Sequence, residues 1–166
     1  MIVQKRTVAL ASLFATLYAV GTIALSPISY GLVQVRLTDS LIALAFIPNI
    51  GMGVVLGVTL GNVVANVFSP YGLPDIVLGT IANLISSYTI YALGKRGGWK
   101  FLILGCVIAS VEIAGIIGIG LLYLIYHVAT LEIAFSFVLI GEMISILFVG
   151  SVLTKAIMVI IVRSQR

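Results

Sequence analysis

Charged residues are scarce in this sequence. They make up 8% of the 166 residues, whereas soluble globular proteins carry about 25%. Nine Lys and Arg residues and five Asp and Glu residues are too few to cover the surface of a water-soluble domain of this length. The mean hydropathy of +1.29 indicates that the protein is surrounded by lipid. A soluble enzyme, a nucleic-acid-binding protein and a disordered chain are therefore excluded.

Cysteine and histidine are nearly absent as well. Cys106 is the one cysteine, so no disulfide bond can form within the chain, and the one histidine, His127, leaves no His/Cys cluster for a metal. The sequence also lacks the phosphate-binding motif G-x-x-x-x-G-K-[ST] and the catalytic motifs H-E-x-x-H and G-x-S-x-G. We expect a membrane protein that is not an enzyme, holds no metal or cofactor and has no ATP-hydrolysing site of its own.

Long apolar runs are what the sequence has in abundance. A helix needs about 20 apolar residues to cross the hydrocarbon core of a bilayer. Four runs are close to this length or longer, and we predict one span in each: Thr7–Leu25, Ile76–Leu93, Phe101–Tyr126 and Ile133–Val162. The first run lacks a small-residue cleavage site followed by a polar domain, so we interpret it as a retained span and not as a signal peptide.

The uncharged run Ser40–Phe68 is ambiguous in length. As one helix its 29 residues would extend over about 44 Å, which is too long for one span and short for two. Pro48 and Asn49, followed by two glycines, offer a break. A short pass over Leu37–Ile47 and a fuller one over Gly51–Phe68 keep the basic residues on one side, as the positive-inside rule prefers. We therefore predict two passes.

The resulting fold class is an all-α integral membrane protein with six transmembrane helices in a single domain over residues 1–166. Both termini and the basic loop Lys95–Lys100 then lie in the cytoplasm. Eight of the nine basic residues are inside, and only Arg36 is outside. We expect a multi-pass protein of the cell membrane.

Two carboxylic side chains, Glu112 and Glu142, lie near the middle of predicted spans. An ionisable group at this depth costs at least ~2.5 kcal/mol on insertion scales, so each calls for a partner or a ligand. Each is either a helix-packing residue, protonated or hydrogen-bonded to a neighbouring helix, or part of a binding site. Gly141 and Ser145, on either side of Glu142, favour a site there.

A second set of polar residues gathers toward the outer ends of the third and fourth spans. Asn62 and Asn66 share one helix face, and Asp75, Gly79 and Asn83 share another. Asp75 is alternatively a helix N-cap. The outer segment Ser29–Asp39 adds further polar groups: Tyr30, Gln34, Arg36 and Asp39.

Arg36 and Asp39 alternatively pair with each other at the surface. Together the polar residues predict an outward-facing pocket for a small, flat, neutral or weakly cationic molecule. The candidate substrate-binding residues are Tyr30, Gln34, Arg36, Asn62, Asn66, Asp75, Asn83, Glu112 and Glu142.

The first predicted span carries a ridge of small residues. Ala11, Ala15 and Ala19 recur every four residues, a spacing that lets another helix pack closely. Alanine is common in membrane helices, so chance is the alternative explanation. On a terminal helix this ridge predicts docking to a second membrane protein.

Several segments, in order along the chain, resemble one known family. They are Ser26–Gly31 leading into Gln34–Leu41, then Gly61–Asn66 followed by Gly72–Gly79, and finally Gly141-Glu142. Together they are similar to the queuosine-precursor transporter (QueT) family, which is one of the substrate-binding S-components of energy-coupling factor (ECF) transporters. The resemblance covers about residues 30–142.

This resemblance implies a function in import. The chain would bind a 7-deazaguanine base at its outer face and dock through the alanine ridge onto a transmembrane coupling protein driven by two ATPase subunits. Glu142 would accept the adjacent N–H groups of the base edge in a charge-assisted fork. Asn62, Asn66 and Gln34 would supply amide contacts, Tyr30 would stack on the ring, and Asp75 would meet an aminomethyl cation on a ligand that carries one.

Two other functions stay open at this point. The chain is alternatively an S-component for another vitamin or nucleobase. The second alternative, from a different class of protein, is a small proton-coupled transporter that uses Glu112 or Glu142 as the proton carrier.

Overall fold

The computed structural model describes residues 2–31 and 34–164, and the side chains of residues 5–31 and 34–161. Arg166, counted above among the cytoplasmic basic residues, lies outside the described residues. The regular secondary structure of the described residues is all helical, with no strand among them. Its elements are α1 (Ile2–Ala24), α2 (Ser26–Ser29), η1 (Leu37–Phe46), α3 (Gly51–Asn66), α4 (Gly72–Gly94), α5 (Trp99–Ile113), η2 (Ala114–Ile125), α6 (Leu131–Glu142), η3 (Met143–Gly150) and α7 (Ser151–Ser164).

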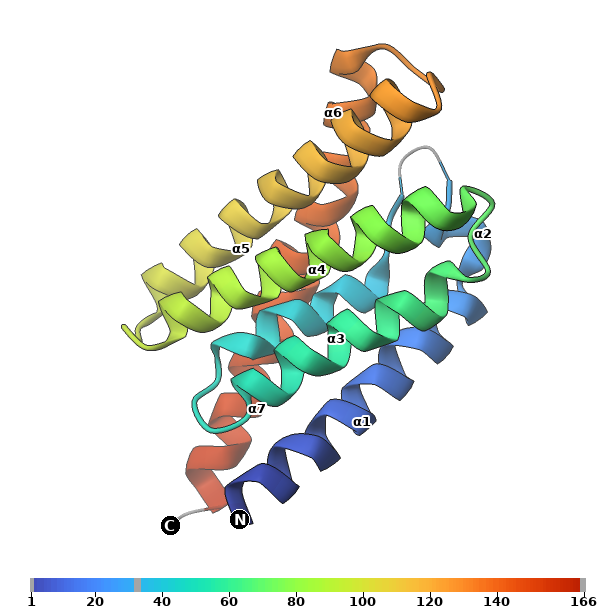
Figure 1. Ribbon diagram of the computed structural model, residues 1–166. Helices are drawn as coiled ribbons and strands as arrows, with labels where there is room; N and C mark the ends of the chain where they lie inside the picture. Colours follow the sequence, from blue (N-terminus) through green and yellow to red (C-terminus); the bar gives the residue numbers. More distant parts are fainter. Residues whose placement is uncertain (1, 32–33, 165–166) are drawn as a thin grey trace.

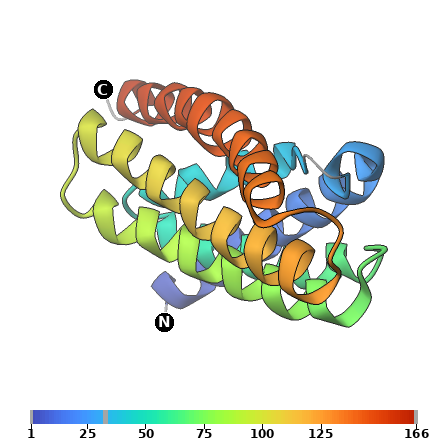
Figure 2. The same ribbon diagram turned by 90° about the horizontal axis from the view of Figure 1, so that it is seen from above.

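The helices run back and forth along one bundle axis (Figure 1). The start of α1, the end of α7 and the α4–α5 turn lie at one end, whereas α2, the α3–α4 loop and the start of α6 lie at the other (Figures 1 and 2). The first of these ends carries the basic loop Lys95–Lys100. We call it the basic end and the opposite one the polar end.

Four helical segments of the described chain are long and apolar enough to cross a membrane: Lys5–Ala24, Gly72–Gly94, Trp99–Ile125 and Leu131–Ile161. Two of them change hydrogen-bonding pattern along their length. Helix α5 continues without a break into the π-helix η2, and α6 continues through the π-helix η3 into α7. π-helical insertions occur frequently at functional sites, and Glu142 is the last residue before η3.

The ambiguous run divides at Pro48-Asn49 into η1 and α3, which are shorter apolar helices. Helix η1 is a ten-residue 3₁₀ helix. At a rise of about 2.0 Å per residue it extends over about 20 Å, farther than an α-helix of equal length would.

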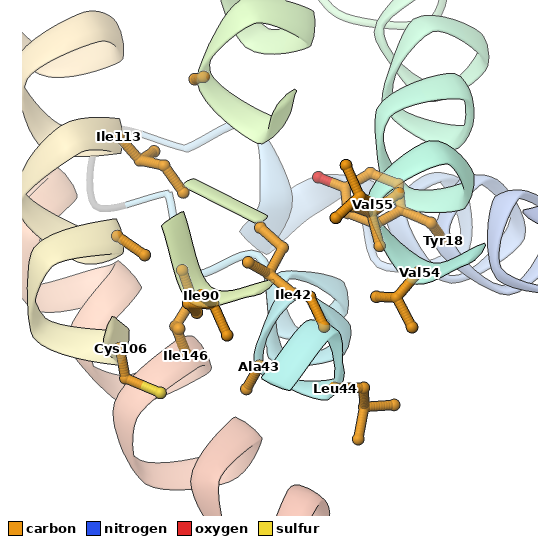
Figure 3. Packing of buried hydrophobic residues seen from close by; sticks show 14 of the residues in the cluster. Tyr18, Ile42, Ala43, Leu44, Val54, Val55, Ile90, Cys106, Ile113 and Ile146 are labelled. Carbon is orange, nitrogen blue, oxygen red and sulfur yellow. The ribbon is translucent and has the colours of Figure 1, made fainter. Parts of the chain in front are cut away.

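Helix η1 is the central element of the bundle. Nearly all of its side chains are buried, and Ile42 and Ala43 are fully so. Figure 3 shows residues of η1 in the middle of the apolar core, between α3 on one side and α4, α5 and η3 on the other; the labelled side chains are Tyr18, Ile42, Ala43, Leu44, Val54, Val55, Ile90, Cys106, Ile113 and Ile146. Its first turn therefore carries Asp39 into the interior at the polar end.

The bundle surface is apolar, as expected of a chain surrounded by lipid. Leu17, Phe148 and Val152 are each about half exposed or more.

Candidate functional site

Buried polar side chains from six parts of the chain meet in the polar half of the bundle. None is more than 3% exposed. We call this group the polar cluster: Tyr18, Arg36, Asp39, Asn62, Asn66, Asp75, Asn83 and Glu142. These side chains form hydrogen bonds and an ion pair with one another.

An ion pair closes the outer side of the cluster. Arg36 Nη2 donates to Asp75 at 3.3 Å from Oδ2 and 3.5 Å from Oδ1, and Arg36 Nε donates to the Ser29 carbonyl at 3.2 Å. The alternative of a local surface pair between Arg36 and Asp39 is therefore wrong. Asp75 lies in the first turn of α4 and makes no N-cap hydrogen bond, since Tyr71 holds the cap position.

Charge stabilises this pair. Burial works against the charged guanidinium, but the attraction of Asp75 together with the other acidic groups around it outweighs burial and raises the pKa of Arg36 above its ordinary value. Ser69 adds a hydrogen bond from its hydroxyl to Asp75 Oδ2 at 2.5 Å.

Tyr30 packs beside the ion pair. Its hydroxyl donates to the Ala65 carbonyl at 2.6 Å, and the Arg36 guanidinium carbon lies 5.4 Å from the ring centroid. Burial raises the pKa of the Tyr30 phenol, which keeps its proton available for that hydrogen bond. One face of the ring is therefore already occupied by a cation.

A directed chain of hydrogen bonds crosses the cluster. Asn66 Nδ2 donates to the Asp75 carbonyl at 2.8 Å and to Asn62 Oδ1 at 3.0 Å. Asn62 Nδ2 donates to the Tyr18 hydroxyl at 3.1 Å, and that hydroxyl donates to Asp39 Oδ1 at 2.5 Å. The chain links the outer ion pair to a second carboxylate deeper in the bundle.

A close helix approach makes room for this chain. A Cβ atom added to Gly79 would lie 2.4 Å from Asn66 Nδ2 and 2.8 Å from Asn62 Oδ1. Real Cβ contacts essentially never fall below 3.0 Å, so a side chain at this position would displace one of the two amides. Glycine at position 79 therefore leaves space for the Asn62 and Asn66 amides between α3 and α4.

The chain of hydrogen bonds ends at a pair of acidic side chains. Asp39 and Glu142 are both buried and lie close enough for their charges to interact, and Asn83 Nδ2 donates to the Val58 carbonyl at 3.4 Å. The sequence assigned Asp39 to the outer segment, but the fold places it in the core, opposite the residue chosen as the ligand carboxylate.

Polar atoms without partners concentrate in this region. Among the described residues, seven buried side-chain atoms have no hydrogen-bond partner, and three belong to the cluster: Asp39 Oδ2, Asn66 Oδ1 and Glu142 Oε2. Leaving such an atom unsatisfied costs about 1–3 kcal/mol. Ser145 Oγ, one turn after Glu142, is a fourth. A ligand that offers donors would relieve this cost.

Three predicted site residues are not members of the polar cluster: Tyr30, which packs beside its ion pair, Glu112 and Gln34. Glu112 Oε1 accepts a hydrogen bond from Thr89 Oγ1 at 2.9 Å between α5 and α4, which fits the helix-packing interpretation. Gln34 is buried and its Nε2 has no hydrogen-bond partner within the described part of the chain.

The comparisons with known proteins agree with this membrane architecture. A family model described as QueT transporter matches residues 8–159, most of the chain. The chain belongs to the QueT transporter family. The searches of curated proteins and of solved structures gave no match.

The predicted resemblance is thereby confirmed. Because QueT is a family of transporters, the chain is not an enzyme. Membership in this family and the four long apolar helices together indicate a membrane protein that handles a small molecule.

The alanine ridge of this QueT protein makes a contact within the chain. Added Cβ atoms on Gly57 and Gly61 of α3 would lie 2.8 Å from the Ala11 carbonyl oxygen and 2.7 Å from the Ala15 carbonyl oxygen. Ala11 and Ala19 are buried, and Ala15 is part-exposed. The ridge thus packs against α3, and Ala15 alone keeps surface available for a partner.

The sequence interpretation missed Tyr18 and Ser69. Tyr18 lies in an apolar run and looks like an ordinary core aromatic residue. One signal was available in the sequence, because Thr22 follows Tyr18 by one turn on the same helix face. In the structure the Thr22 hydroxyl lies 2.6 Å from the Thr38 hydroxyl. A polar stripe on α1 therefore faces η1.

Proposed function

We propose that this protein is the substrate-binding S-component of an ECF-type importer. In this proposal it forms a single domain over residues 1–166 in the cell membrane. It captures a queuosine precursor, a 7-deazaguanine base, from outside and delivers it inward with a coupling protein and two ATPase subunits. The chain has no phosphate-binding loop, and in this proposal the ATPase subunits of the module supply the energy.

The observation that carries the binding proposal is the set of unpartnered acceptors in the polar cluster. Buried side chains offer free oxygen atoms at Asp39, Asn66 and Glu142. A guanine-type edge presents N1–H and exocyclic N–H donors side by side. A carboxylate accepts two such donors in a fork, which is stronger than a neutral hydrogen bond. This complementarity supports Glu142 as the principal ligand-binding residue.

The other proposed site residues form two groups, one around the base and one on the outer side of the cluster. Asn62, Asn66 and Asn83 are proposed to surround the base, because they already surround Asp39 or its hydrogen-bonded neighbours. Arg36, Asp75 and Tyr30 close the outer side, and we propose that they separate to admit the ligand. Glu112 is left out of the proposed site because Thr89 is its contact.

The proposed topology has six spans with both termini in the cytoplasm. The back-and-forth course of the helices supports it, because it gathers the basic loop, the start of α1 and the end of α7 at one end (Figure 1). The positive-inside rule then assigns the basic end to the cytoplasm and the polar cluster to the outer half. Docking of the coupling protein is proposed on α1 beside the part-exposed Ala15.

Uptake into proteoliposomes tests the proposal. With the protein, a coupling module and ATP present, we expect labelled 7-deazaguanine to accumulate, and we expect no uptake without ATP or without the module. Accumulation driven by a proton gradient without ATP would instead support the proton-coupled alternative. Binding without uptake under any condition would reject the transport mechanism and leave the binding site standing.

A further inference from the structure

The polar cluster contains two carboxylic side chains where the proposed ligand fork needs only one. Asp39 is 1% exposed and Glu142 is 1% exposed, and each keeps one unpartnered oxygen atom. They lie close enough for their charges to interact. Two adjacent buried acceptors with free lone pairs require donors from elsewhere.

Asp39 is oriented by a hydrogen bond from within the cluster. Its Oδ1 accepts the Tyr18 hydroxyl at 2.5 Å, and Asn62 in turn donates to that hydroxyl at 3.1 Å. Because Tyr18 occupies Oδ1, the free atom Oδ2 has a fixed direction. Asp39 comes from η1 and Glu142 from the end of α6, so the two approach the shared space from different helices.

A guanine-type base offers one donor more than a single carboxylate can use. Its edge carries three N–H bonds: N1–H and the two of the exocyclic amino group. A fork at Glu142 takes N1–H and the nearer amino hydrogen. The third N–H points away from the fork, and its natural acceptor is a second carboxylate beside the first.

We propose that Asp39 accepts this third N–H, so that Asp39 determines specificity for a free exocyclic amino group and Tyr18 is its positioning residue. This inference rests on the proposed binding of a 7-deazaguanine. It adds the chemical feature that the site selects, and it assigns roles to Tyr18 and Asp39. A site built to hydrogen-bond a group discriminates strongly against analogues that lack it, because its own polar atoms stay unpaired.

The test compares two ligands on the purified protein by calorimetry: 7-deazaguanine and its N2-methyl analogue. The analogue keeps N1–H and one amino hydrogen, so the Glu142 fork survives while the donor to Asp39 is lost. We expect the parent protein to bind the analogue at least about tenfold more weakly, the effect of losing a hydrogen bond to a charged group.

Asp39→Asn separates this hydrogen bond from a steric effect of the methyl group. Tyr18 would hold the amide oxygen, so an NH₂ group would face the ligand in place of an acceptor. We expect the preference between the two ligands to fall below about threefold. If Asp39→Asn keeps the preference of the parent protein, the methyl group is rejected by shape and the inference fails.

Tyr18→Phe provides a second variant that removes one hydroxyl group only, and it keeps the test decisive if Asp39→Asn does not fold. We expect its preference to be smaller than that of the parent protein. An unchanged preference in Tyr18→Phe would remove its positioning role. Glu112→Gln and Tyr91→Phe are matched controls outside the cluster, and both should keep the parent preference.

The outcomes separate the inference from the proposed function. A parent protein that binds neither ligand contradicts the proposed function itself. A parent protein that binds both ligands equally well supports binding of the base but contradicts the role of Asp39.

Discussion

Replacing Arg36 by Gln should destabilise the protein more than any other single change to a basic residue. Arg36 is 3% exposed, Asp75 is fully buried, and their charged atoms are 3.3 Å apart. At that distance and an effective dielectric constant of about 20, the attraction is about 5 kcal/mol. Desolvation offsets part of it, but removing one partner leaves the other charge buried.

We therefore expect Arg36→Gln to lower the free energy of unfolding by about 3–5 kcal/mol. Asp75 would then keep Ser69 as its side-chain donor. The double variant Arg36→Gln/Asp75→Asn removes both charges, so it should cost less than the sum of the two single variants by at least about 1.5 kcal/mol. The measurement is unfolding by a denaturing detergent titrated into mild-detergent micelles, followed by circular dichroism.

Arg96→Gln is the matched control. Arg96 is exposed at the basic end and its guanidinium carbon lies 5.6 Å from the Phe101 ring centroid. An exposed contact of this kind contributes about 0.5–1 kcal/mol. If Arg36→Gln costs no more than Arg96→Gln, or if the single effects of Arg36→Gln and Asp75→Asn simply add, Arg36 and Asp75 do not form a buried pair.

Three further predictions follow from the site and the topology. Glu142→Gln should weaken 7-deazaguanine binding by about 1.5–3 kcal/mol, or tenfold to a hundredfold, measured by calorimetry; an unchanged affinity would exclude the fork. Gly79→Ala should lower both stability and ligand affinity, since its Cβ would collide with two amides, whereas Gly115→Ala, with no atom within 4 Å of the added Cβ, should be neutral or stabilising in a thermal melt. If Gly115→Ala destabilised the protein more than Gly79→Ala, the close approach of α3 and α4 at Gly79 would be contradicted. A cysteine placed at Gly97 should resist labelling by a membrane-impermeant reagent added outside intact cells, and efficient labelling there would reject a cytoplasmic basic end.

Much of the helix arrangement could be predicted from the sequence, because apolar length and turn residues are local signals. The break at Pro48-Asn49 was predicted from residue types alone, and it separates η1 from α3. The 3₁₀ form of η1 could not be predicted, because in a buried helix tertiary packing can override local propensity. The short helix α2 was likewise missed.

The partners of the polar residues were harder to predict, because they join distant parts of the chain. A local pair between Arg36 and Asp39 is the natural interpretation of three-residue spacing, yet Arg36 pairs with Asp75, 39 residues away. Asp39 is carried inward by a helix whose burial the sequence does not reveal. The predicted polar residues are largely correct as a set, but their contacts depend on the fold.

The alanine ridge illustrates a signal that was available and unused. Gly53, Gly57 and Gly61 also recur every four residues, on a neighbouring helix. Two small-residue ridges in one chain can pack on each other as readily as on a partner. They do so here, between α1 and α3.

Native mass spectrometry of the purified protein tests the central claim most directly. Incubated with 7-deazaguanine, the chain should retain one molecule of the base, and Glu142→Gln should lose it at a concentration where Glu112→Gln keeps it. Retention of the base by Glu142→Gln but not by Glu112→Gln would place the site at Glu112 and contradict the assignment to Glu142. A parent protein that retains no base at any concentration would contradict the claim that the polar cluster is a binding site for 7-deazaguanines.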